Sequence, residues 1–380
     1  MKTIQMVDLK GQYEKIKPEV DAAIMQVIET SSFIRGAAVK SFQDKLQMYL
    51  GIEHVIPCGN GTDALQLALM ALDLKPGDEV ITTDFTFAAT VEVIGLMNLK
   101  PVLVDIDPED FNISVEAIKK AIGPKTKAII PVHLFGKSCD MEEIMELANK
   151  NNLFVIEDSA QGLGGSFQFA NNEIKKLGTI GHIGTTSFFP SKNLGAYGDG
   201  GAVFTSDPSI AERIRSLANH GMSKRYHYDR IGINSRLDSM QAAILNCKLP
   251  HLDRYANSRR TAARFYNEAL EGINEITCPY FENSEGYFDH VFHQYTLRVS
   301  NGHRDRLKTY LADLDIPTAI YYPKALHTQK AYEGLLDQDL DLRACIKASQ
   351  EVLSLPMHTE LDQQQLSFIT TSIKEYFKAI

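Results

Sequence analysis

Short apolar runs alternate with stretches of helical periodicity through the first half of the chain. The runs are three to five residues long, and the segments between most of them are long enough to form a helix. Parallel strands joined by crossover helices produce this alternation. We therefore predict an α/β layer built on a largely parallel sheet. The predicted strands cover residues 79–82, 101–105, 128–132, 154–156, 185–189 and 201–204.

The pattern changes after about residue 238. A long helical stretch runs from Ser239 to about Leu270 and is interrupted by Pro250, which lacks the N–H that a helix interior needs. Beyond it, residues 294–299 form a strand candidate, and residues 304–314 and 341–353 have helical patterns. We predict a smaller C-terminal α+β domain, so that the large domain covers residues 1–250 and the small one residues 251–380.

Three polar side chains follow predicted strands: His133, Asp158 and Lys192. Ligands bind at the carboxyl ends of strands in open α/β sheets, so these side chains are candidate functional groups. Lys192 lies between an aromatic strand end and a glycine-rich turn, where a lysine can lose its proton and attack a carbonyl. Asp158 ends an apolar run. A reactive lysine together with such an aspartate is the pair that pyridoxal phosphate requires.

Each of these residues also has a simpler interpretation. A lysine after a strand is usually a solvated surface residue, and Asp158 could cap a helix that opens with Asp-Ser-Ala-Gln. His133 could be a hydrogen-bonded core histidine or could face a substrate. The pattern alone leaves these alternatives open.

A candidate phosphate site lies near residue 60. Small and capping residues there run directly into a helix-forming stretch that includes Gly61 and Thr62. The first amides of a helix have no intrahelical partner and carry the positive end of the dipole, so they can bind an anion. The Thr62 hydroxyl could add a hydrogen bond, and Ser187, on the strand before Lys192, could supply another donor.

Composition excludes several classes of protein. The 380 residues can form a large core, and the formal charge of −9 argues against a nucleic-acid or anionic-membrane partner. No apolar run has membrane-spanning length, and the first residues lack the apolar core of a signal peptide, so we expect a cytoplasmic protein. The five cysteines have no metal-ligand spacing. We expect free thiols and no metal site.

Several ordered motifs resemble those of one family. They include Asn-Gly-Thr-Asp-Ala-Leu at residues 60–65, Glu-Asp-Ser-Ala-Gln at 157–161, Ser-Phe-Phe-Pro-Ser-Lys-Asn-Leu-Gly at 187–195, Asn-Ser-Arg-Leu-Asp at 234–238 and Tyr-Tyr-Pro at 321–323. In this order they are similar to the sugar aminotransferases of the DegT/DnrJ/EryC1/StrS family, over nearly the whole chain. The resemblance implies a fold-type I transferase that depends on pyridoxal phosphate. Its large α/β/α domain would have a mostly parallel sheet of seven strands.

The resemblance also implies roles for individual residues. Lys192 and Asp158 would be catalytic, and the substrate, a nucleotide sugar, would receive its amino group from glutamate. Such enzymes are homodimers with shared active sites, in which Asn234 reaches the cofactor phosphate of the neighbouring subunit. The expected cofactor contacts are Gly61, Thr62, Phe87, Asp158, Gln161, Ser187, Lys192 and Asn234, with Phe87 stacked on the ring, and the expected substrate contacts are Arg236, Tyr322 and His327.

The substrate is defined less sharply than the cofactor. The Ser-Arg-Leu-Asp segment followed by Gln-Ala-Ala is similar to enzymes that aminate C3, and above all to those acting on UDP-2-acetamido-2-deoxy-3-oxo-glucuronate for O-antigen or other surface polysaccharide. Arg236 would then bind the sugar carboxylate or the diphosphate. Arg35 stands where similar proteins often have leucine. The alternatives are a dTDP-3-keto-6-deoxyhexose aminotransferase and a regulator that binds the cofactor or a sugar nucleotide without turnover.

Overall fold

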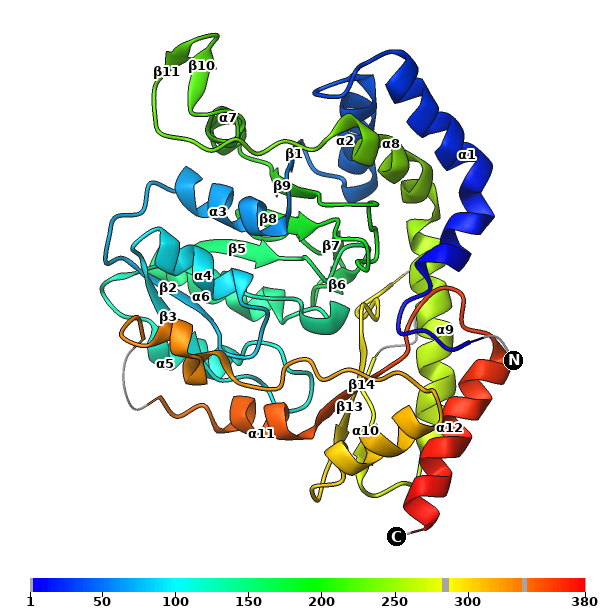
Figure 1. Ribbon diagram of the computed structural model, residues 1–380. Helices are drawn as coiled ribbons and strands as arrows, with labels where there is room; N and C mark the ends of the chain where they lie inside the picture. Colours follow the sequence, from blue (N-terminus) through cyan, green and yellow to red (C-terminus); the bar gives the residue numbers. More distant parts are fainter. Residues whose placement is uncertain (1–2, 282–286, 337–339, 380) are drawn as a thin grey trace.

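A seven-stranded sheet forms the centre of the computed structural model, which describes residues 3–281, 287–336 and 340–379 (Figure 1). The strand order is β1-β9-β8-β5-β4-β2-β3. The five strands from β8 to β3 are parallel, whereas β9 runs antiparallel to both β8 and β1. The mostly parallel sheet predicted from the sequence is confirmed. Its strands are β1 (His54–Cys58), β2 (Glu79–Thr83), β3 (Lys100–Val104), β4 (Thr126–Ile130), β5 (Phe154–Asp158), β8 (Ile183–Ser187) and β9 (Gly201–Thr205).

Helices cover both faces of this sheet. Ile130 and Ile156 pack with α3, α4 and α7, whereas the preceding residues on the same strands, Ile129 and Val155, pack with α5 and α6. Neighbouring residues of a strand point to opposite faces, so a strand that is buried on both sides must be apolar throughout. This explains the continuous apolar runs. The helices are α3 (Gly61–Ala71), α4 (Ala89–Leu96), α5 (Val115–Ala121), α6 (Met141–Asn151) and α7 (Pro208–Leu217), with the short η1 (Leu134–Gly136).

The N-terminal helices lie beside α8 at one end of the sheet (Figure 1). Ile16 and Val20 of α1 pack on Ile244, and Phe42 of α2 packs with Leu245 of α8 in another cluster. The helices are α1 (Leu9–Glu29), α2 (Ala37–Leu50) and α8 (Ser239–Lys248). Two hairpins extend from the large sheet region, formed by β6 (Ser166–Gln168) with β7 (Ile174–Lys176) and by β10 (Met222–Lys224) with β11 (His227–Tyr228).

The C-terminal part is built on a three-stranded antiparallel sheet of β12 (Ile276–Thr277), β13 (Tyr295–Val299) and β14 (Val352–Leu355). α9 and α12 lie side by side along it (Figure 1). Its apolar cluster also takes in Ile4 from the start of the chain. The remaining elements are η2 (Leu249–His251), α9 (Leu252–Leu270), α10 (Arg304–Asp313), η3 (Leu326–Thr328), η4 (Lys330–Tyr332), α11 (Arg343–Glu351) and α12 (Gln363–Lys378).

One predicted boundary is wrong. The helix expected over residues 341–353 ends at Glu351, and Val352 begins strand β14 instead. Leu353 and Leu355 lie opposite Leu297 and Tyr295 of β13, and every residue of β14 is buried. A short apolar run next to a helix has no periodicity of its own, so only its long-range partner reveals the strand.

The predicted division at residue 250 falls in η2, the short helix that contains Pro250 and separates α8 from α9. Beyond it, Leu326 and Cys345 pack against Phe85 and Leu134 of the large sheet region. The two parts therefore share an apolar contact at the carboxyl ends of the strands. The division into residues 1–250 and 251–380 stays a prediction.

Two further expectations concern membrane-spanning segments and the cysteine thiols. Within the described part of the chain, no helix is long and apolar enough to cross a bilayer. All five cysteines are unpaired.

Candidate active site

Lys192 lies in a tight turn that follows β8. Its backbone N–H donates to the Phe189 carbonyl at 2.8 Å. A Cβ added at Gly195 would lie only 2.2 Å from the Pro190 carbonyl oxygen, so the turn requires glycine there. Lys248 of α8 holds the same turn, because its Nζ donates to the Gly195 carbonyl at 2.5 Å. The backbone that carries Lys192 is thus fixed from two sides.

The Lys192 amine is adapted for nucleophilic chemistry. Burial lowers its pKa to about 8, against the opposing effect of the nearby Asp158 carboxylate. The amine makes no hydrogen bond to any residue that the structure describes. A lysine with this pKa is partly neutral at physiological pH, so it can attack a carbonyl or accept a proton.

Asp158 ends the central strand β5 and is 4% exposed. Its backbone N–H donates to the Pro131 carbonyl at 2.9 Å, and its carbonyl accepts from the His133 N–H at 3.1 Å. The side-chain carboxylate of Asp158 is also held by hydrogen bonds. Thr90 Oγ1 donates to Oδ2 at 2.9 Å, and the Ala160 N–H donates to Oδ1 at 3.1 Å. Both oxygens keep a second lone pair that can accept from a ligand.

Thr90 was not among the residues predicted from the sequence. It is 1% exposed at the start of α4, and its hydroxyl is also 3.4 Å from that of Thr86. Thr86 lies in the bend before α4, so this contact joins the bend to the first turn of the helix. The sequence gives no local signal that links Thr90 to Asp158, which is 68 residues away.

Glu157 lies next to Asp158 on β5 and points to the opposite face of the sheet. Its carboxylate accepts from the N–H groups of Gly178, Ile180 and Gly181 at 2.6–2.8 Å, and it lies 3.0 Å from His133 Nε2. His133 Nδ1 accepts from a backbone N–H at 3.2 Å, so Nε2 carries the proton and donates. His133 is 0% exposed. It is therefore a hydrogen-bonded core histidine and does not face a substrate.

The predicted phosphate site is the start of helix α3. Asn60 caps the helix, because its Oδ1 accepts from the Asp63 N–H at 2.8 Å. A Cβ at Gly61 would lie 2.7 Å from Ser187 Cβ, and one at Gly201 would lie 2.4 Å from the Asn60 carbonyl oxygen. These close approaches place the Ser187 side chain against the first residue of the helix. Gly61, Thr62 and Ser187 thus surround a point where an anion can bind.

Gln161, Tyr322 and Phe87 form one wall beside Asp158. Gln161 Nε2 donates to Tyr322 Oη at 3.3 Å, and its Oε1 accepts from the Phe135 N–H at 2.7 Å. The Tyr322 ring lies 6.4 Å from that of Phe87. Burial raises the pKa of Tyr322, and the Asp158 charge adds to this shift. Phe87 is 58% exposed, so its ring is open to a ligand.

His327 is fixed by Asp84, which directly follows strand β2. Its Nδ1 lies 2.6 Å from Asp84 Oδ2, and its backbone N–H donates to Asp84 Oδ1 at 2.7 Å. Asp84 is buried, which raises its pKa, whereas His327 lowers it. Asp84 was also missed in the sequence, because 243 residues separate the two partners.

Asn234 and Arg236 lie on a loop at the other side of α3. The neighbouring Ser235 bonds to Asp63 Oδ2 at 2.6 Å and accepts from the Gly59 N–H at 2.8 Å. No contact within the described residues joins Arg236, Asn234 or His327 to Lys192. The structure therefore assembles Lys192, Asp158, Gln161, Tyr322 and Phe87. It places His327 at Asp84 after β2, and it places Asn234 and Arg236 on the loop that Ser235 joins to the start of α3.

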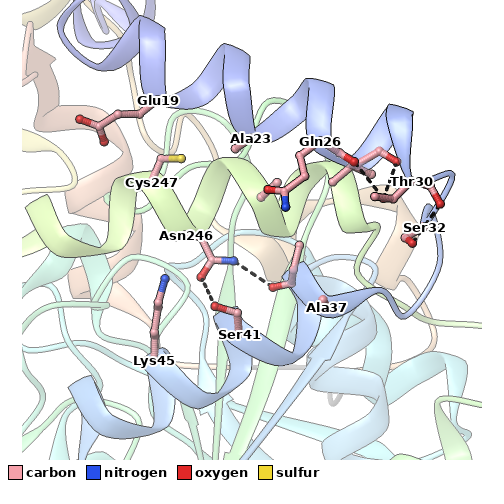
Figure 2. A pocket seen from close by; sticks show the side chains of 13 residues that line it. Glu19, Ala23, Gln26, Thr30, Ser32, Ala37, Ser41, Lys45, Asn246 and Cys247 are labelled. Atoms are coloured by element: carbon pink, nitrogen blue, oxygen red, sulfur yellow. Dashed lines mark hydrogen bonds between the residues drawn. The ribbon is translucent and has the colours of Figure 1, made fainter.

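A hollow of about 520 Å³ lies between α1, α2 and α8 and contains none of these residues (Figure 2). Small and uncharged polar side chains make up most of its lining. Asn246 bridges it, donating to the Ala38 carbonyl at 2.9 Å and accepting from Ser41 at 3.2 Å. Its lining also includes Glu19, Lys45 and Cys247, but none of the residues gathered around Asp158 and Lys192.

The assembled residues fit pyridoxal phosphate. Lys192 would hold its aldehyde carbon, Asp158 its ring nitrogen and the start of α3 its phosphate. The exposed face of Phe87 would lie against the ring. The fit depends on the buried Asp158 carboxylate, whose two hydrogen bonds leave free lone pairs, and on the nearby Lys192 amine, whose pKa is lowered by burial.

Comparison with known proteins gives the same result. The sequence model of the DegT/DnrJ/EryC1/StrS aminotransferase family matches residues 14–374. A "pleiotropic regulatory protein" of Geobacillus stearothermophilus is 44% identical and covers 99% of each chain. The UDP-2-acetamido-2-deoxy-3-oxo-D-glucuronate aminotransferase of Pseudomonas aeruginosa is 41% identical over 97% of this chain and 99% of its own. A UDP-N-acetyl-3-dehydro-alpha-D-glucosamine 3-aminotransferase of Acidithiobacillus ferrooxidans is 43% identical over 98% and 97%.

Solved structures show the same fold. A DegT DnrJ EryC1 StrS aminotransferase from Brucella abortus superimposes with a TM-score of 0.92 at 41% identity, covering 98% of this chain and 99% of its own. The Bacillus subtilis protein NtdA, solved with bound cofactor PMP, has a TM-score of 0.88 at 31% identity, covering 96% and 82%.

The lowered pKa of Lys192 gives a first prediction. Brief treatment of cofactor-free protein with pyridoxal phosphate and borohydride should label Lys192 with a midpoint near its pKa of about 8, because only the neutral amine attacks the aldehyde. Asp158→Asn should move that midpoint to lower pH, since the Asp158 charge raises the pKa of Lys192. Peptide mass spectrometry across a pH series measures both. A midpoint near that of an ordinary lysine, about 10.4, or labelling mainly at another lysine, would contradict the assignment.

Proposed function

The chain belongs to the DegT/DnrJ/EryC1/StrS aminotransferase family, and we propose that it moves an amino group from glutamate to C3 of a UDP-linked 3-keto sugar. It is a nucleotide-sugar aminotransferase with pyridoxal phosphate as cofactor. The observation that carries the proposal is the Lys192 amine, which has a pKa of about 8 and lies near the buried Asp158.

The cofactor, when bound, supplies an aldehyde that accepts amines and a ring that withdraws electrons from the reacting carbon. The residues of this chain direct that chemistry. Asp158, fixed by Thr90, would stabilise positive charge on the ring nitrogen. The helix start at Gly61 and Thr62, with Ser187, would bind the phosphate dianion and so keep the cofactor in place during the reaction.

Lys192 would act as the base of both halves of the reaction. Its Nζ, partly neutral at pH 7–8, would take the proton from the α-carbon of glutamate. In the second half, in which the nitrogen taken from glutamate replaces the carbonyl oxygen and that oxygen leaves as water, Lys192 would deliver a proton to C3 of the sugar. The wall of the buried Gln161 and the partly buried Tyr322 would limit the access of water to this transfer.

We propose a uronate as the sugar, because Arg236 can bind a carboxylate through two parallel hydrogen bonds. The Pseudomonas aeruginosa relative acts on such a uronate and the Acidithiobacillus ferrooxidans relative on an N-acetylglucosamine derivative, so the C6 group distinguishes the two candidate substrates. The product would serve surface-polysaccharide synthesis, such as O-antigen of lipopolysaccharide, in the cytoplasm. A purely regulatory role is the alternative, since one relative carries a regulatory name.

The second prediction concerns the C6 group of the sugar. With glutamate as donor, a UDP-linked 3-keto uronate should be aminated about ten- to a hundredfold more efficiently than the UDP-linked 3-keto sugar with a neutral C6. The range follows from about 1.5–3 kcal/mol for a hydrogen bond to a charged group. Arg236→Lys should reduce the preference, because an ammonium cannot bind both oxygens in parallel.

Steady-state kcat/KM on both sugars, and on a dTDP-linked 3-keto-6-deoxyhexose, measures this preference. Equal efficiency would exclude the uronate proposal, and a preference for the dTDP sugar would favour the alternative substrate. No amination of any of them, and no conversion of glutamate, would favour the regulatory role.

The third prediction concerns assembly. We propose a homodimer in which Asn234 completes the neighbouring site, because in the single chain Asn234 has no contact with Lys192 and lies exposed. Mixed dimers of the inactive Lys192→Ala and Asn234→Ala subunits should then recover activity, since a twofold dimer built from both has one intact site. Subunit exchange is verified with tagged chains. Complete inactivity after proven exchange would rule out the shared site.

A further inference from the structure

Two distant segments hold a pair of arginines side by side. The loop at residues 33–36 is joined to residues 238–239 by an isolated β-bridge between Ile34 and Asp238. The Ser239 N–H donates to the Phe33 carbonyl at 2.9 Å, and the Gly36 N–H donates to Ser239 Oγ at 3.1 Å. These contacts bring the backbone of the first loop next to the loop that carries Arg236.

Arg35 and Arg236 line one hollow of about 340 Å³ that contains no acidic side chain. Lys40 and Arg215 also border it. Lys40 is paired with Asp44, and Arg215 lies 3.5 Å from a histidine nitrogen. Within the described residues the two guanidiniums of Arg35 and Arg236 have no hydrogen-bonded or ionic partner. Both are therefore available to a ligand.

The two guanidiniums are close enough to repel each other. The pKa of Arg35 is lowered, first by burial and then by the charge of Arg236. Arg35 also adopts a φ of 53°, in the left-handed region that most side chains avoid because the Cβ is crowded there. A glycine at this position would avoid both costs. An anion bound between the two guanidiniums would offset them.

We propose that Arg35 and Arg236 together bind one anionic group of the sugar nucleotide, so that Arg35 is a second specificity-determining residue. This rests on the proposed function. The anionic group is an oxyanion, either the C6 carboxylate or the diphosphate, because a pair of guanidinium forks suits both. Ser235 ties the Arg236 loop to the start of α3, and Asn234 lies on the same loop. The two arginines therefore belong to the same active site as Asn234, which is proposed to be that of the neighbouring subunit.

The structure offers a matched set of variants. Arg35→Gly removes the guanidinium and suits the positive φ, so it preserves the loop. Lys40→Ala removes a cation from the same hollow that is already paired with Asp44, and it serves as the control. Calorimetric titration of the holoenzyme with UDP-glucuronate, UDP-N-acetylglucosamine and UDP needs no turnover. Its outcome is therefore independent of the amino-transfer assay that tests the proposed function.

Arg35→Gly should weaken UDP-glucuronate binding by about ten- to a hundredfold, whereas Lys40→Ala should change it less than about threefold. A loss confined to UDP-glucuronate identifies the carboxylate, and an equal loss for all three ligands identifies the diphosphate. In the double variant Arg35→Gly/Arg236→Gln, the fold-loss of UDP-glucuronate affinity should be smaller than the product of the two single-variant losses. The reason is that both residues bind the same anion. Wild-type affinity in Arg35→Gly, or losses that simply multiply, would overturn the proposal.

Discussion

The site depends on the carboxylate of Asp158 being held in one orientation at the end of a buried strand. Removing a carboxylate from water costs free energy unless hydrogen bonds and an opposite charge compensate for it. Here Thr90 and the Ala160 N–H each donate to one oxygen, and the Lys192 amine lies near enough to sense the charge. The backbone of Asp158 is bonded to the neighbouring β4 segment through Pro131 and His133, so the carboxylate has little freedom to turn away.

The same strand supports the site from its other face. Glu157 alternates with Asp158, so its side chain points away from Lys192 and binds the Gly178–Gly181 turn together with His133. This buried network joins the ends of β4 and β5 to the segment that leads into β8, the strand that positions Lys192. The two adjacent carboxylates therefore have different roles. Glu157 stabilises the strand ends, and Asp158 remains available to the cofactor.

Much of this arrangement could be predicted from the sequence. Apolar runs that end in Asp158 or precede Lys192 predict buried strands, and they place both residues at the carboxyl edge of the sheet. These runs are visible in the sequence because each consists of a few consecutive residues. Features that depend on contacts between distant segments were missed or misjudged. Val352 was assigned to a helix because its partner strand is more than fifty residues earlier. Thr90 and the pairing of Arg35 with Arg236 become visible only when the loops are folded together.

The most direct test of this account compares the reaction with glutamate alone in three variants that keep the fold. Asp158→Asn removes the charge, Thr90→Val removes the hydrogen bond that orients it, and Thr90→Ser retains that bond. Stopped-flow absorbance of the bound cofactor measures the rate, with circular dichroism as the control for folding. Loss of one partner from a buried charged pair costs about 3–5 kcal/mol, so Asp158→Asn should be at least a hundredfold slower, Thr90→Val intermediate and Thr90→Ser close to wild type. A near-normal rate in Asp158→Asn would contradict the central role of this carboxylate.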